Sequence, residues 1–171
     1  MDFDKLVEQC LEKNRDQVIH NASMEHAKIL FRTLLRAAET DAESVKIVTY
    51  NLNNNFYGDL VDVGESCLES GGTFEVVVLN PDADLSDNSF ACMVKRHTNG
   101  TIIQIVEALN DFAHFIVVGD KRYRFETDHG QTKAVANFND SSVGEVLVER
   151  FDLLKEYIKD KGLSKKNAPG Y

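Results

Sequence analysis

The chain has 171 residues, a mass of 19.2 kDa and a formal net charge of −9 at pH 7. This length fits one domain, and a composition of 43% hydrophobic and 27% charged residues is that of a globular protein. The acidic balance argues against nucleic acid as a partner, because Lys and Arg contacts to phosphate supply most non-specific affinity. No apolar run approaches the roughly 20 residues of a membrane span, so no membrane partner is expected.

The cysteines give no sign of a disulfide framework or a metal site. Cys10, Cys67 and Cys92 are scattered singly, without a CxxC pair or metal-ligand spacing. An odd number of isolated cysteines, with no signal-peptide order at the N-terminus, predicts a reduced cytoplasmic protein. No cofactor is expected.

Hydrophobic periodicity predicts alternating helices and strands in the first half of the chain. Helices are expected at residues 3–13, 22–40 and 57–70, and strands at residues 44–50 and 73–79. Because helices separate these strands, they are expected to pair in parallel through right-handed crossovers.

The second half predicts a hairpin followed by a strand and a long helix. Residues 90–96 leave helix and non-helix open, and residues 101–109 have apolar positions at helical spacing. The other expected elements are hairpin strands at 113–118 and 121–126, a strand at 133–138 and a helix at 141–159. The fold class is therefore α/β, a mixed β-sheet flanked by helices, with amphipathic helices at both ends. Residues 1–160 form a single domain, and residues 161–171 form a flexible tail.

The hairpin also predicts which side chains share a face. Gly119-Asp120 reads as a two-residue turn, which would pair Val118 with Lys121 and place His114 opposite Phe125. Because side chains alternate between faces, His114 would then lie on the apolar face. The charged side chains Arg122, Arg124 and Glu126 would lie together on the other face.

The order of these segments resembles the phospholipase D-like fold. The segments are a helix, the strand KIVTYNL, a second helix, the strand FEVVVLNP, the strand HFIVVGDK and a later strand ending in Asn, within residues 23–160. In that family a half-domain carries a His-x-Lys-x4-Asp motif, whose His attacks phosphorus while the Lys and an Asn hold phosphoryl oxygens. The family pairs two half-domains about a twofold axis, which implies that this chain, with one half, forms a homodimer.

The resemblance places unsuitable residues at the catalytic positions. Aligning FIVVGDK puts Phe112 at the nucleophile, His114 at the lysine and Gly119 at the aspartate, and Asn137 or Asn139 at the asparagine. Phenylalanine cannot attack phosphorus, whereas a protonated His114 could bind an anion. The match implies a degenerate half-domain that lacks the intact motif.

The segment YRFETDH contains the densest polar cluster. Glu126 or His129 could act as an acid or base there, together with His114, while Arg122 and Arg124 hold an anion. The same pattern also fits the solvated face of a strand, and His114 fits a hydrogen-bonded core residue. The spacing of Glu126 and His129 does not match that of a metal-binding helix, so no metal site is expected.

A second group of candidate contacts follows the strand at residues 44–50. Ligands bind at the carboxyl ends of parallel strands, and Tyr50 and Asn51 lie there, with Asn53 and Asn80 in the adjoining loops. Asn-rich loops also occur without function, because Asn tolerates turn conformations.

Three functions remain open on the sequence. The first is a non-catalytic phospholipase D-like binding or regulatory module that acts as a homodimer in the cytoplasm. The second is a phosphodiesterase or other hydrolase that uses His114 with Arg124, Glu126 or His129. The third is an acidic module that binds a basic protein partner through its net charge of −9.

Overall fold

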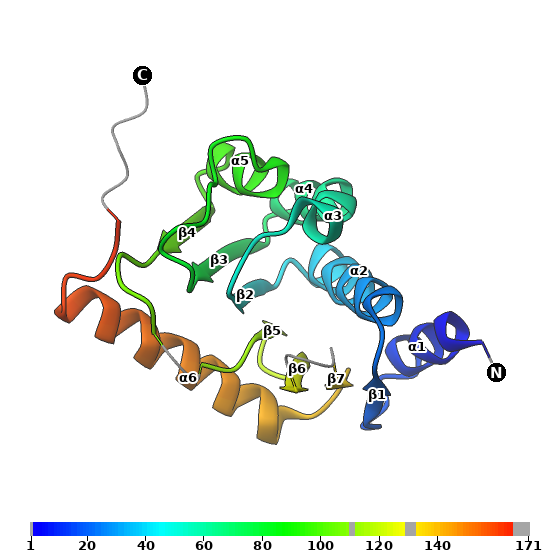
Figure 1. Cartoon of the computed structure of the whole chain (residues 1–171). Helices are drawn as coiled ribbons and strands as arrows, with labels where there is room; N and C mark the ends of the chain where they lie inside the picture. Colours follow the sequence, from blue (N-terminus) through cyan, green and yellow to red (C-terminus); the bar gives the residue numbers. More distant parts are fainter. Residues whose placement is uncertain (1, 110–111, 129–132, 166–171) are drawn as a thin grey trace.

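A mixed β-sheet organises the computed structural model, which describes residues 2–109, 112–128 and 133–165 (Figure 1). Within these residues seven strands form one sheet in the order β1-β7-β6-β5-β2-β3-β4. The strands are β1 (Ile19–Asn21), β2 (Ser44–Thr49), β3 (Thr73–Val78), β4 (Gly100–Gln104), β5 (Phe115–Val118), β6 (Arg122–Asp128) and β7 (Lys133–Asn137).

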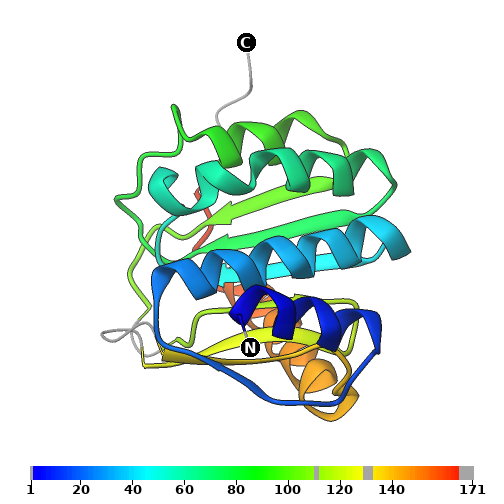
Figure 2. The same ribbon diagram turned by 90° about the vertical axis from the view of Figure 1, so that its right-hand side faces the viewer.

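Helices cover both faces of this sheet. Figures 1 and 2 show α2, α4 and α5 side by side on one face, with α1 against α2, and α6 along the other face. Two apolar cores result, one between the sheet and α2–α5 and one between the sheet and α6. The helices are α1 (Phe3–Glu12), α2 (Met24–Asp41), α3 (Asn54–Tyr57), the 3₁₀-helix η1 (Gly58–Leu60), α4 (Val61–Glu69), α5 (Ser89–Arg96) and α6 (Ser141–Asp160).

Strand direction divides the sheet into two halves. β2, β3 and β4 run parallel, and β5, β6, β7 and β1 continue the sheet with antiparallel pairs. The α/β class and the mixed sheet predicted from the sequence are confirmed, as is the parallel pairing of residues 44–49 with 73–78.

The helix expected at residues 101–109 is wrong, because this segment contains β4. Ile102 faces the core beneath α2–α5, whereas Ile103 and Ile105 pack in the core beneath α6. A strand that is covered on both faces has apolar residues at odd and even positions, and here they coincide with helical spacing. The open segment 90–96 is helical, as α5, and Asn88 caps it by accepting a hydrogen bond from the Ala91 amide at 2.8 Å.

The predicted hairpin exists, but its predicted register is wrong by one residue. Val118 pairs with Arg122 and Phe115 with Phe125, so three residues form the turn. Gly119 adopts a φ of 59°, a conformation open to glycine, and its amide still donates to the Ser44 carbonyl at 2.9 Å. Gly119 therefore continues the pairing of β5 with β2, and the pairing of β5 with β6 begins at Arg122.

The one-residue shift exchanges the partners of the hairpin side chains. The amide of Glu126 donates to the carbonyl of His114 at 2.9 Å, so these two residues lie opposite each other. Ile116 and Val118 belong to the core beneath α2–α5, and Phe115 and Tyr123 to the core beneath α6. Consequently His114, Arg124 and Glu126 share the face that is covered by α2.

The first residues of the predicted flexible tail are held against the edge strand. Ser164 forms an antiparallel bridge with Ile105, and the Lys165 amide donates to the Gln104 carbonyl at 2.7 Å. These contacts attach residues 164 and 165 to the segment that contains β4. The remainder of the predicted tail, residues 166–171, lies outside the described residues.

The contact of α6 with the hairpin turn gives a stability prediction. A Cβ on Gly144 would lie 2.1 Å from the Asp120 carbonyl oxygen, so Gly144→Ala must separate two backbones. We expect this change to lower the free energy of unfolding by about 1–3 kcal/mol, although Ala favours a helix. Urea unfolding measures it. Gly58→Ala is the matched control, because its Cβ would meet only Ser89 Oγ at 3.6 Å, and equal midpoints for the two variants would contradict the prediction.

Candidate functional site

A cavity of about 170 Å³ lies where β2 ends, between the sheet and helices α2 and α3. Its wall combines aromatic rings with a cluster of polar and charged groups. The lining residues are Met24, Ala27, Phe31, Thr49, Asn51, Asn53, Phe56, Tyr57, His114, Phe115, Arg124 and Glu126.

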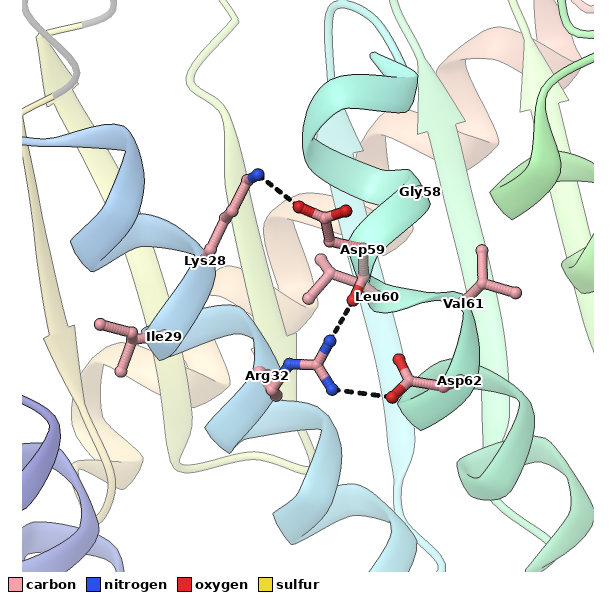
Figure 3. Close-up of a pocket in the computed structure, with 8 residues that line it drawn as sticks. All are labelled: Lys28, Ile29, Arg32, Gly58, Asp59, Leu60, Val61 and Asp62. Carbon is pink, nitrogen blue, oxygen red and sulfur yellow. Dashed lines mark hydrogen bonds and ion pairs between the residues drawn. The ribbon is translucent and has the colours of Figure 1, made fainter.

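A larger hollow, of about 700 Å³, is open between α2 and the segment from Gly58 to Asp62 (Figure 3). Its two cations are already paired. Lys28 binds the Asp59 carboxylate, and Arg32 binds the Asp62 carboxylate at 2.9 Å and the carbonyl oxygen of Asp59 (Figure 3). These bonds tie α2 to η1 and α4, so the hollow reads as a structural joint and the smaller cavity as the candidate site.

Aromatic rings form the apolar wall of the cavity. Phe31 meets Phe56 and Tyr57 edge-on, with ring centroids 5.0 and 5.8 Å apart, and Phe56 and Tyr57 also meet edge-on at 5.0 Å. Edge-to-face packing is a preferred arrangement of such rings. Phe31 belongs to α2, and Phe56 and Tyr57 belong to α3, so the packed rings of two helices form this wall.

Arg124 supplies the buried charge. Its side chain is 5% exposed, its Nε donates to Asn21 Oδ1 at 3.2 Å, and its guanidinium lies 5.7 Å from the Phe31 ring centroid. Burial lowers the pKa of Arg124, and the charge of Glu126 works in the opposite direction. Since an arginine stays charged at neutral pH, the cavity wall carries a cation.

The terminal nitrogens of Arg124 retain capacity to bind. The Glu126 carboxylate lies 3.8 Å from one of them, beyond hydrogen-bond distance. No side-chain or main-chain oxygen of the described residues accepts a hydrogen bond from either terminal nitrogen. A guanidinium in this state favours a bidentate anion.

His114 and Glu126 lie side by side in the lining of the same cavity. His114 Nδ1 lies 3.0 Å from Glu126 Oε2, and their side chains are 16% and 10% exposed. A carboxylate at this distance from a ring nitrogen fixes the orientation of the imidazole.

Tyr57 completes the polar lining as a neutral donor. Burial raises the pKa of Tyr57 to about 12, although its hydrogen bond with Thr49 works against this. Asn51 lies beside it and accepts a hydrogen bond at Oδ1 from Asn80 Nδ2 at 2.8 Å, which joins the loops after β2 and β3.

The structure brings together only part of the residue set expected from the sequence. His114, Arg124, Glu126 and Asn51 line the cavity. Tyr50, the residue after β2, is 42% exposed and is absent from the lining. His129 lies outside the described residues, so its place in the predicted cluster is not defined.

Arg122, Asn137 and Asn139 lie at the opposite end of β6 and β7, near the hairpin turn. Arg122 binds the carboxylates of Asp41, at 2.7 Å, and Glu43. Asn137 donates to Asp16 at 2.8 Å, and Asn139 Nδ2 donates to the Asn14 carbonyl at 3.0 Å. These contacts fasten the α1–β1 and α2–β2 connections to the sheet.

Sequence reasoning missed the residues that α2 and its flanking segments bring to the site. Asn21 and Phe31 both contact Arg124, although Asn21 is 103 positions away in the chain. Only the register of the hairpin could have indicated these contacts from the sequence. Had a three-residue turn been assumed, Arg124 would have been placed on the sheet face that the predicted helix at residues 22–40 covers.

No helix among the described residues has the length and apolarity needed to cross a bilayer. Nor do the described His, Cys, Asp and Glu side chains form a group of three that could hold a metal ion.

Comparison with known proteins identifies the fold. No family model and no curated protein sequence matches this chain. Solved structures do match it, and three of them illustrate the likeness. NucT from Helicobacter pylori gives a TM-score of 0.62 at 11% identity, over 83% of this chain and 97% of NucT. Nuc from Salmonella typhimurium, a phospholipase D family member, gives 0.55 at 14% identity, over 88% and 96%.

The third structure belongs to a longer protein. TrmBL2, an archaeal chromatin protein that binds DNA, gives a TM-score of 0.59 at 15% identity over 90% of this chain. This chain spans 57% of the length of TrmBL2. At these identities the likeness concerns the fold, and the resemblance expected from the sequence is confirmed at that level: the chain has a phospholipase D-like fold.

Proposed function

We propose that this chain, which has a phospholipase D-like fold, is a binding or regulatory module that holds a small anionic ligand without cleaving it. The observation that carries the proposal is Arg124, whose side chain is 5% exposed in the cavity wall and whose terminal nitrogens make no hydrogen bond to the described residues. A buried cation with unused donors gains most from a bidentate carboxylate or phosphate.

The cavity limits the size and shape of this ligand. Its volume of about 170 Å³ lies below the roughly 300–1,000 Å³ of typical ligand pockets, which favours a small ligand. The aromatic wall suits an apolar body, and Glu126 and Tyr57 suit a hydroxyl group. The ligand class is therefore a compact acid with an apolar or ring-shaped body.

The residues at the catalytic positions of the resemblance support binding without turnover. The resemblance places Phe112 at the nucleophile position, and a phenyl ring has no lone pair for attack on phosphorus. DNA binding of the TrmBL2 kind receives no support, because a net charge of −9 opposes contact with phosphates.

Arg124 variants test the ligand class. We expect phenyl phosphate and benzoate to bind with saturation in calorimetry, and Arg124→Gln to weaken the tighter ligand at least tenfold through loss of the paired charge. Arg124→Lys keeps the charge but loses the bidentate geometry, so we expect intermediate affinity. Arg96→Gln, at a side chain 62% exposed, is the matched control. Equal affinity in folded Arg124→Gln and wild-type protein would exclude this site.

The homodimer is the second part of the proposal. It is supported by the resemblance, in which two half-domains pair, and by the frequency of closed twofold assemblies. A reduced, cytoplasmic setting agrees with three cysteines that are all free.

Sedimentation measures the dimer. We expect a mass near twice 19.2 kDa, and we expect Phe112→Ala to weaken the dimer because the segment before β5 lies near the proposed interface. Val106→Ala, at a side chain 47% exposed, is the control. A monomeric wild-type protein would refute the dimer and leave the cavity, which lies within one chain, as a complete site.

The alternative is a hydrolase, and the His114–Glu126 pair favours it. A carboxylate 3.0 Å from Nδ1 orients the imidazole, and a histidine oriented by a carboxylate is the group that acts as general base or nucleophile in many hydrolases. Arg124, on the same wall, would stabilise the charge that develops on a phosphoryl oxygen.

Turnover of bis(p-nitrophenyl) phosphate separates the two functions. On the binding proposal, wild-type protein releases no p-nitrophenol above background, with or without divalent metal. The hydrolase instead requires release that falls at least a hundredfold in His114→Ala and is unchanged in His97→Ala, a histidine at the C-terminal end of α5 that lies 3.4 Å from Glu65.

A further inference from the structure

The outer surface of α6 carries a second apolar stripe beside the stripe that faces the core. Half of the exposed large apolar side chains in the described residues lie on it: Val143, Val146, Leu153 and Tyr157, which are 38%, 58%, 58% and 46% exposed. Their spacing, with Arg150 in the gap, is the three-four repeat of a helix-packing seam. The same repeat, displaced by one position along the helix, gives the buried residues Leu147, Phe151, Leu154 and Ile158.

An acidic groove runs along the solvent side of this stripe. A hollow of about 370 Å³ lies along α6 beside Asp120 of the hairpin turn, and Leu153 belongs both to the hollow and to the stripe. All of its charged lining residues are acidic: Asp120, Glu145, Glu149, Asp152 and Glu156. The surface is thus apolar along one side and negative along the next.

Most of this negative charge is not neutralised by other described residues. Asp152 receives a bond from Lys46 at 2.8 Å, but Glu145, Glu149 and Glu156 make no ion pair with any described residue. Arg150, within the stripe, offsets one charge. In paired helices, charged residues that flank the apolar seam determine which partner binds. A row of carboxylates beside the seam favours a partner helix with positive charges.

We propose that α6 docks a cationic amphipathic helix of another protein. The partner would set leucine-like side chains between Val146, Leu153 and Tyr157 and would direct lysines or arginines toward Glu149 and Glu156. The seam from residue 143 to residue 157 is about 21 Å long at 1.5 Å per residue, which matches four turns of a partner helix.

A second copy of this chain fits the surface less well. Four half-exposed side chains offer a few hundred Å², below the roughly 800 Å² per partner of a standard stable interface. Two copies would also bring like carboxylate rows together. The surface lies on the opposite face of the sheet from the cavity with Arg124, so this inference is independent of the proposed ligand.

A synthetic peptide of three heptads tests the proposal, with Leu at the two seam positions of each heptad and Lys at the flanking positions. We expect saturable one-to-one binding in fluorescence anisotropy. The double substitution Leu153→Ser, Tyr157→Ser should weaken it at least tenfold. Val18→Ser, which removes an equally exposed apolar side chain (50%) near β1, should leave it unchanged.

The acidic row is tested separately by Glu149→Gln and Glu156→Gln, which are surface changes that leave folding intact. Each should weaken the peptide several-fold at low ionic strength and reduce the loss of affinity on adding salt. A shuffled peptide with the same composition but no seam should not saturate.

Two results would overturn the proposal. Equal binding of the shuffled peptide would mean that only non-specific charge attraction operates. A wild-type dimer that becomes monomeric in the Leu153→Ser, Tyr157→Ser variant would mean that a second copy covers the stripe. Circular dichroism on each variant confirms that a loss of binding is not a loss of fold.

Discussion

The register of the β5–β6 hairpin is the constraint on which the site depends. With three residues in the turn, Arg124 pairs with Ile116 and lies under α2, where Asn21, Phe31 and Glu126 contact it. A register shifted by one residue would turn Arg124 toward the apolar core beneath α6, and burying a charge there without partners is very costly. The same shift would move Tyr123 and Phe125 out of that core. The alternation of apolar and charged residues along β6 is therefore compatible with only this register.

Two arginines on the same face of β6 have different electrostatic surroundings. Arg122 is neutralised by two carboxylates, Asp41 and Glu43, and it fastens the α2–β2 connection. Arg124 faces one carboxylate, at 3.8 Å, and burial lowers its pKa. Two carboxylates compensate the charge of Arg122 within the chain, although its buried Nε has no hydrogen-bond partner among the described residues. Arg124 has one more distant carboxylate, which is why the cavity beside it is the site best suited to an anion.

The sequence predicted most of the fold and only part of the site, for a physical reason. Strong periodicity fixed the helices at α2 and α6 and the strands β2 and β3. It failed at β4, where burial on both faces mimics a helix. The site depends on contacts between distant segments, such as Asn21 with Arg124, and no local pattern encodes these. One additional residue in the hairpin turn decides which face of β6 points toward the cavity. Gly119 is compatible with a two-residue turn and with a three-residue turn, so the sequence does not distinguish them.

The pattern on α6 shows why a sequence can indicate a helix and still misjudge its surface. Val143, Leu147, Leu154 and Ile158 all fit one apolar face in the sequence, yet Val143 is 38% exposed while the other three are buried. The apolar sector of this helix is wider than the contact with the sheet, because Val146, Leu153 and Tyr157 extend it by about a quarter of a turn. A helix that packs on one sheet face needs only the narrower sector. Since half-exposed apolar side chains add little to folding, the extra sector is better explained by a partner than by the fold, and it is bordered by Glu149 and Glu156, which pair with no described residue.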